Sequence, residues 1–213
     1  PWCPPDDARP DDAGAEAAAG TEAGAMRLFV ALDLPASLRE RLSWMARGLP
    51  GARWVPPENY HVTLRFIGEV PGYQAGEIDE ALAGIRAPGF ALRLAGVGVF
   101  HKGAKASALW AGVERSPALD HLRTKVETAL QRLGLEPERR RFAPHVTLAR
   151  TERAAPDKTV AFVQAHNLFR AAPVPVEGFA LYSSRLGKEQ AVYEREVEYG
   201  LLEPRPAPAA ARA

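Results

Sequence analysis

Cysteine is nearly absent from this 213-residue chain, and long apolar runs do not occur in it. The single cysteine, Cys3, has no partner for a disulfide within the chain and excludes a zinc site built on cysteine pairs. No stretch of 18 apolar residues is present, so no segment is expected to span a membrane. The expected setting is therefore reducing and cytoplasmic.

Several common catalytic signatures are also missing. The sequence contains no HExxH zinc motif, no GxSxG nucleophile motif, no P-loop and no GxGxxG dinucleotide fingerprint. We therefore expect neither a metal ion nor a nucleotide cofactor.

Composition divides the chain into a body and two ends. Residues 1–25 are rich in Pro, Ala, Gly and Asp and carry six acidic residues against one basic residue, which predicts a disordered acidic extension. Met26, where the first convincing strand begins, is expected to be the natural start. Residues 201–213 read as a disordered Pro/Ala tail, and residues 26–200 as one domain of two lobes. Without the extension the chain has a net charge of +6, which suits a ligand that bears phosphate.

Strand and helix patterns alternate through the body. Period-2 and β-rich segments predict strands over 26–32, 53–55, 61–67, 90–100, 107–113, 145–149, 176–183 and 191–198. Amphipathic segments predict helices over 37–49, 73–85, 117–133 and 157–167. We therefore expect an α+β protein of two related lobes.

The tetrapeptide HVTL occurs twice, at residues 61–64 and at 145–148, with one copy in each half of the body. Five His and seven Thr in this length predict about 0.16 His-x-Thr by chance, so the pair favours a function. In a strand, alternate side chains share a face, so His61 lies beside Thr63 and His145 beside Thr147. Each copy is thus expected to anchor two apolar residues in its lobe and to present an imidazole and a hydroxyl.

Two such strands across a cleft would place two imidazoles and two hydroxyls in one small volume. Histidine titrates near neutral pH, so the pair supplies a general acid and a general base. The two hydroxyls supply hydrogen-bond donors to an oxyanion. This nearly symmetric set matches in-line displacement at phosphorus, where the entering and leaving oxygens lie on opposite sides.

The contexts of the two motifs, with RLFVALDLP at the start of the body, WVPPENYHVTLRFIGEV around the first copy and RFAPHVTLAR around the second, carry a resemblance. Residues 26–200 resemble the two-histidine phosphoesterases, and among them the RNA 2′,3′-cyclic phosphodiesterases once called 2′-5′ RNA ligases. The resemblance implies a bilobal, pseudo-symmetric fold in which two antiparallel sheets line a central cleft and the helices lie outside. It also implies metal-free hydrolysis of RNA 2′,3′-cyclic phosphate ends to 2′-phosphates.

The resemblance also assigns roles to residues. It makes His61 the proton donor to the departing 3′-oxygen and His145 the proton acceptor that activates water, and it gives phosphate binding to Thr63 and Thr147. Arg150 would contact the terminal base, with an exposed arginine at a strand end as the alternative. The motifs by themselves do not say which histidine is the acid. Arg139, Arg140 and Arg141 could contact phosphates upstream of the RNA end, with a solvated loop as the alternative.

Other functions remain open at this point. A non-catalytic module that binds RNA ends or nucleotides could use the same basic, hydroxyl-lined cleft. Ligation of 2′-5′ linked RNA, as the reverse reaction, and hydrolysis of 2′-5′ linked oligonucleotides are alternatives within the enzyme class. The expected partners are an RNA with a 2′,3′-cyclic phosphate end or the corresponding nucleoside, without a membrane, and the expected state is a monomer.

Overall fold

The computed structural model describes residues 25–103, 105–186 and 191–203. The helices are α1 (Ala36–Ser43), η1 (Pro57–Asn59), α2 (Gly72–Ala83), α3 (Pro117–Arg132) and α4 (Pro156–His166). The strands are β1 (Met26–Asp33), β2 (Arg53–Trp54), β3 (His61–Val70), β4 (Phe90–Leu92), β5 (Leu94–Lys102), β6 (Lys105–Val113), β7 (His145–Arg150), β8 (Val174–Val176), β9 (Gly178–Leu186) and β10 (Ala191–Gly200). The predicted acidic extension, up to residue 24, and the predicted tail beyond residue 203 lie outside the described residues.

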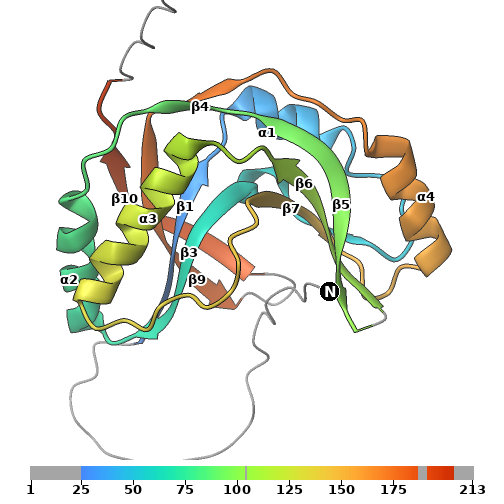
Figure 1. Ribbon diagram of the computed structural model, residues 1–213. Helices are drawn as coiled ribbons and strands as arrows, with labels where there is room; N and C mark the ends of the chain where they lie inside the picture. The colour runs from blue at the N-terminus through green and yellow to red at the C-terminus, as the bar shows by residue number, and fades with distance from the viewer. Residues whose placement is uncertain (1–24, 104, 187–190, 204–213) are drawn as a thin grey trace, which may run out of the picture.

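The strands form two four-stranded antiparallel sheets, so the α+β prediction is confirmed. The first sheet has the order β10-β9-β1-β3 and the second has the order β2-β7-β6-β5, while β4 and β8 pair separately. Strands β3 and β7, which begin with the two HVTL copies, contact one another where the sheets meet. Helix α3 packs on β3 and against α2, and α4 packs on β5 and β6, so the helices lie on the outer sides of the sheets (Figure 1).

Neither sheet is built from one continuous half of the chain. In the first sheet β9, from the second half, pairs with β1, and in the second sheet β5, from the first half, pairs with β6. Helix α3 follows β6 of the second sheet but packs on β3 of the first. The two lobes are therefore interleaved, and neither can be cut from the chain as a single segment.

The core lies between the helices and one face of each sheet. Leu28, Val30 and Leu32 of β1 and Leu109 and Ala111 of β6 are almost completely buried. Burial of each large apolar side chain contributes about 2 kcal/mol to stability. The alternate residues of β1, Phe29 and Ala31, are buried as well, on the side of the sheet that carries His61.

Two predicted elements differ from the structure. Helix α1 ends at Ser43, six residues before the expected end, because the amides of Met45 and Ala46 bond to carbonyls three residues back and Gly48 takes a positive φ of 82°. The strand predicted over 90–100 is divided at Arg93, because β4 pairs with β8 in a small separate sheet whereas β5 pairs with β6.

Backbone hydrogen bonds to the body continue for two residues past residue 200, the C-terminal boundary predicted for the domain. The amide of Leu201 donates to the carbonyl of Glu177 at 2.7 Å, and Leu202 exchanges backbone hydrogen bonds with the segment that precedes β4. The chain therefore stays attached to the body as far as Leu202.

Candidate active site

The two histidines occupy matching positions and are held in the same way. His61 is the first residue of β3 and His145 the first residue of β7. Nδ1 of His61 lies 2.8 Å from the carbonyl oxygen of Asn59, and Nδ1 of His145 lies 2.7 Å from that of Ala143. A carbonyl oxygen only accepts, so Nδ1 is the protonated nitrogen in both rings. Each ring therefore has Nε2 as the nitrogen available for proton transfer.

The residues that follow each histidine alternate between the two faces of the sheet, as predicted. Val62 and Leu64 expose at most 3% of their surface, and Val146 and Leu148 are completely buried. Thr63 lies opposite Ala31 of β1, and Thr147 lies opposite Trp110 of β6. Both threonines are half-buried and share a face with their histidine.

The two imidazoles lie close enough to act on one another. Burial is the main cause that lowers the pKa of His61, and a positive charge on His145 lowers it further. The two rings therefore share one electrostatic environment although they lie 84 positions apart in the chain. Their strands come from different sheets and meet at the β3–β7 contact. The pairing of motifs that the repeat suggests is therefore present in the fold.

Arg150 also reaches this region. It ends β7 of the second sheet, and its charge acts on the phenol of Tyr193, which belongs to β10 of the first sheet. The ring of Tyr193 lies 5.3 Å from that of His61, with the two rings perpendicular. Arg150, Tyr193 and His61 thus converge from three strands of two sheets.

Aromatic residues enclose His61, and sequence reasoning did not find them. Phe29 lies 5.0 Å from the imidazole, Tyr193 packs on both rings, and Tyr182 stacks on Phe29 at 5.1 Å. These residues come from β1, β9 and β10. The aromatic letters are visible in the predicted strands, but the strand order that brings them to β3 is a tertiary property.

A bulge in β3 decides which side chains join this face. The register of β1 against β3 shifts between Thr63 and Arg65, and Arg65 lies opposite Val30 of the core. Strict alternation would place Arg65 beside His61; the bulge turns it towards α3 instead. The next residue, Phe66, then lies opposite Phe29, with ring centroids 6.0 Å apart, on the face of His61.

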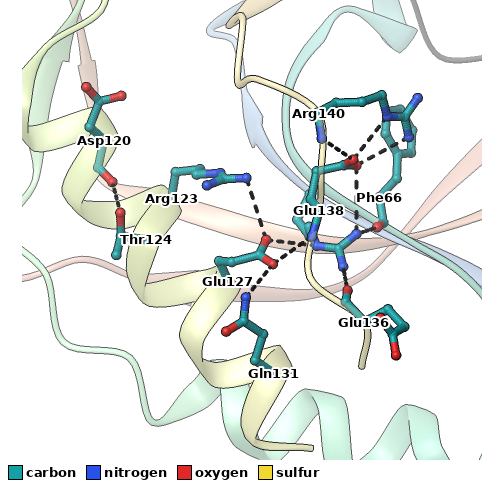
Figure 2. Close-up of polar contacts among 10 residues, drawn as sticks. Phe66, Asp120, Arg123, Thr124, Glu127, Gln131, Glu136, Glu138 and Arg140 are labelled. Carbon is teal, nitrogen blue, oxygen red and sulfur yellow. Dashed lines mark hydrogen bonds and ion pairs between the residues drawn. The ribbon is translucent and has the colours of Figure 1, made fainter. Parts of the chain in front are cut away.

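Arg65 belongs to a largely buried ionic cluster that holds the loop in front of the second motif. Figure 2 shows its carboxylate partners, Glu127 of α3 and Glu138 of the loop. Nε of Arg65 lies 2.9 Å from Oε2 of Glu127, and Arg65 also donates to the carbonyls of Phe66 and Glu136. Glu127 in turn accepts a hydrogen bond of 2.9 Å from the amide of Glu138. The first motif strand is thereby tied to the loop that carries Ala143, the acceptor for His145.

The arginines of this loop are engaged with its own carboxylates. Arg140 donates to Glu138 at 3.0 Å, and Arg139 lies 3.8 Å from Glu136. Arg139 is strongly exposed, and its ion pair is of the kind that contributes little to stability. These two ion pairs are those expected of a solvated loop, the alternative to contact with RNA phosphates.

Burial dominates the acid–base properties of both histidines. It lowers the pKa of His61 to about 4, against the opposing effects of the bond to Asn59 and the charge of Asp33. It also lowers the pKa of His145, against the bond to Ala143. Desolvation disfavours the charged imidazole, so both rings are neutral at pH 7 in the free protein.

A groove of about 580 Å³ opens next to Asp33, Tyr182 and Tyr193, and its lining includes neither His61 nor His145. Its lining also includes Arg39 and Arg195, and through the two tyrosines it continues from the aromatic surroundings of His61. Within residues 25–103, 105–186 and 191–203, no three His, Cys, Asp or Glu side chains gather so that they could hold a metal ion. Of the helices in these residues, none is long and apolar enough to cross a membrane.

Comparison with protein families identifies the class. The family described as LigT like Phosphoesterase matches residues 32–110 and 112–193, which include both HVTL motifs. This chain belongs to that family, so the resemblance and the fold class inferred from the sequence are confirmed.

Individual relatives agree with this placement. A protein of Thermotoga maritima named RNA 2′,3′-cyclic phosphodiesterase is 33% identical over 188 residues, which cover 83% of this chain and 98% of the relative. Proteins of the same name from Geobacillus stearothermophilus (38% identical) and Aeropyrum pernix (44% identical) match over 57% and 50% of this chain. The match spans only 41% and 61% of the length of these two relatives.

Solved structures show the same fold. Escherichia coli LigT complexed with 3′-AMP is 28% identical with a TM-score of 0.71, and the match covers 84% of this chain and all of that one. A protein of Thermus thermophilus, TT0787, is 27% identical with a TM-score of 0.72, at the same coverage of both chains.

Proposed function

We propose that this protein hydrolyses RNA 2′,3′-cyclic phosphate ends to 2′-phosphates without a metal ion. The observation that carries the proposal is the matched pair of histidines, each with Nδ1 bound to the carbonyl two residues before it and with Nε2 left for proton transfer. The names of the relatives, RNA 2′,3′-cyclic phosphodiesterase, supply the substrate class.

In this mechanism His145 acts as the base and His61 as the acid. Nε2 of His145 accepts a proton from water as the water oxygen bonds to phosphorus. The bond from phosphorus to the 3′-oxygen breaks on the opposite side, and Nε2 of His61 gives its proton to that oxygen. The products are a 2′-phosphate and a 3′-hydroxyl, and the pair ends with its proton on the other histidine.

Electrostatics support a pair that holds one proton. Burial makes both rings neutral in the free protein, and the charge of one ring opposes protonation of the other. A bound phosphodiester anion favours an imidazolium beside it. Substrate binding is therefore expected to bring one proton to the pair, which is the number that acid and base catalysis requires.

The remaining site residues bind the substrate. We assign the hydroxyls of Thr63 and Thr147 as hydrogen-bond donors to the non-bridging oxygens of the phosphate, because each shares a face with its histidine. Arg150 is assigned to the terminal base, in keeping with its place near Tyr193. The substrate partner is RNA with a cyclic phosphate end, and we infer a monomer in the cytoplasm.

The test is turnover of a nucleoside 2′,3′-cyclic phosphate in the presence of a chelator. The wild type is expected to form only the 2′-phosphate, while His61→Ala and His145→Ala each lose at least about a hundredfold in rate. His121→Ala, which changes an exposed histidine of α3, is the matched control. Loss of activity on chelation that zinc restores, or a 3′-phosphate product, would contradict the mechanism.

The alternative functions give different results in the same experiment. A non-catalytic module would bind the nucleotide, with no turnover and no effect of the histidine changes on product. A preference for 2′-5′ linkages would appear as faster cleavage or joining of 2′-5′ linked oligonucleotides than hydrolysis of the cyclic phosphate. The intact acid–base pair favours catalysis, since binding a phosphate needs Thr and Arg but no second histidine.

A further inference from the structure

A carboxylate lies beside one of the two histidines and has no counterpart at the other. Asp33 ends β1 directly opposite His61 in the β1–β3 ladder. Side chains opposed in this way share a face, with Cβ atoms about 4.5–5.5 Å apart. The corresponding partner of His145 in the β6–β7 ladder is Gly112, which has no side chain.

The glycine opposite His145 cannot be exchanged for a carboxylate without disturbing the fold. A Cβ atom added to Gly112 would lie 2.5 Å from the carbonyl oxygen of Ala95 and 3.2 Å from the ring of Trp110. The backbone of β5 therefore fills the place that a side chain would take. The asymmetry between Asp33 and Gly112 is built into the packing of the two sheets.

Two side chains from neighbouring strands hold the Asp33 carboxylate. The hydroxyl of Tyr182 in β9 donates to Oδ1, and Nη1 of Arg195 in β10 donates to Oδ2 at 2.9 Å. Arg195 also lies 3.0 Å from Glu198, so its charge is shared between two carboxylates. Asp33 is thus fixed in position by two side chains.

The other titratable groups near His61 do not take over this part. His145 and Arg150, from β7, carry positive or no charge. Burial raises the pKa of both Tyr182 and Tyr193, so these phenols stay neutral at neutral pH. Among the described residues, Asp33 is the anion whose charge favours protonation of His61.

We propose that Asp33, held by Tyr182 and Arg195, stabilises the imidazolium of His61, the proton donor of the proposed mechanism. The inference rests on the proposed function, in which one histidine must be charged and the other neutral. The bound phosphate anion favours a proton on either ring, and at His61 the charge of Asp33 adds to this effect and opposes burial, which lowers the pKa of that ring. Asp33 acts on His61 through its electric charge and does not contact the reacting atoms.

Two substitutions test the proposal because they act in opposite directions. Asp33→Asn removes the anion and is expected to lower the pKa of His61 by at least about half a unit. Arg195→Gln removes the cation that offsets Asp33 and is expected to raise the pKa of His61. General damage to the fold would not shift one titration in both directions, and Arg195 is an exposed side chain outside the core.

The measurement is an NMR titration of the imidazole carbons with inorganic phosphate bound, assigned with His61→Ala and His145→Ala. Arg185→Gln is the matched control, because Arg185 of β9 forms a similar exposed pair with Glu194 of β10, at 3.0 Å, without Asp33. The titration of His61 is expected to be unchanged in this control. In Asp33→Asn the hydrolysis rate is expected to fall about tenfold, with its alkaline limb moved to lower pH.

Shifts of His61 in the same direction in Asp33→Asn and Arg195→Gln, or no shift in either, would overturn the proposal. The titration does not depend on turnover, so it separates this proposal from the proposed function. Opposite shifts without hydrolysis would leave the charge role of Asp33 standing and remove the phosphodiesterase assignment. Hydrolysis without the opposite shifts would do the reverse.

Discussion

The two motif strands share a sequence, and each histidine bonds through Nδ1 to the carbonyl two residues before it, but the surroundings of the two histidines differ. His61 is enclosed by aromatic rings from three strands and lies opposite Asp33. His145 meets the edge of Phe100, with centroids 4.7 Å apart, and lies opposite Gly112. The repeated HVTL motif supplies two equivalent imidazoles. The residues around each histidine, which are not repeated, can give each imidazole its own role.

The difference continues one residue beyond each motif. Leu64 is followed by Arg65, which the bulge turns towards the ionic cluster on α3, whereas Leu148 is followed by Ala149, which is completely buried. The first strand therefore holds the loop in front of the second motif through the Arg65 side chain, whereas Ala149 pairs through its backbone with Trp54, in the segment in front of the first motif.

Removing each histidine in turn tests most strongly whether the two histidines have different roles. His61→Ala and His145→Ala are both expected to lose at least about a hundredfold in kcat. The residual activity should rise with pH in His61→Ala, where a neutral base remains, and fall with pH in His145→Ala, where an acid remains. Residual rates measured from pH 4 to pH 9 check this. The same pH dependence in both variants would mean that the two roles are not divided.

Breaking the Arg65 cluster tests the dependence of the second half on the first. Arg65→Met leaves Glu127 without its buried partner and is expected to lower the free energy of unfolding by about 3 kcal/mol. Urea unfolding measures this loss. Arg115→Met, which breaks an exposed pair with Asp120 at 2.9 Å, is the control and is expected to cost at most about 1 kcal/mol. An equal loss in both variants would show that the cluster does not hold the loop.

The two threonines allow a more balanced comparison. Thr63→Val and Thr147→Val keep the shape of the side chain and remove the hydroxyl that we assign to the phosphate oxygens. Each is expected to lose about tenfold to a hundredfold in kcat/KM, because one donor to the transition state is removed. Thr159→Val is the control, since that hydroxyl bonds to the carbonyl of Ala155 within α4. A loss in one motif variant alone would confine phosphate binding to one half.

Much of this arrangement could be predicted from the sequence. The paired motifs predicted both histidines, both threonines and the faces they share, because strand alternation is a local property. The α+β class followed from the order of periodic segments. The family resemblance supplied the two sheets, which local patterns do not specify.

The rest depends on tertiary packing. Phe29, Tyr182 and Tyr193 reach His61 only because β9 and β10, from the far end of the chain, join β1 in one sheet. The bulge after Thr63 reverses the alternation, so strand parity alone gives the wrong face for Arg65 and Phe66. The partnership of Asp33 with His61 is a matter of register between β1 and β3, which no local pattern fixes.

The smallest expected effect concerns the pH at which the pair loses its proton. The pH profile of kcat/KM gives the pKa values of the histidines in the free protein, and that of kcat gives their pKa values in the substrate complex. In the free protein burial lowers the pKa of both histidines, that of His61 to about 4, so the single proton that catalysis needs is lost as the pH rises, below pH 6.5. A bound phosphodiester anion favours the charged pair, so the complex keeps this proton to higher pH. The alkaline limb of kcat is therefore expected at least about one pH unit above that of kcat/KM.

Rate profiles in buffers of constant ionic strength measure both limbs. If the two limbs coincided, the charge of the bound substrate would not be what protonates the pair. One histidine would then have to carry the proton before the substrate binds.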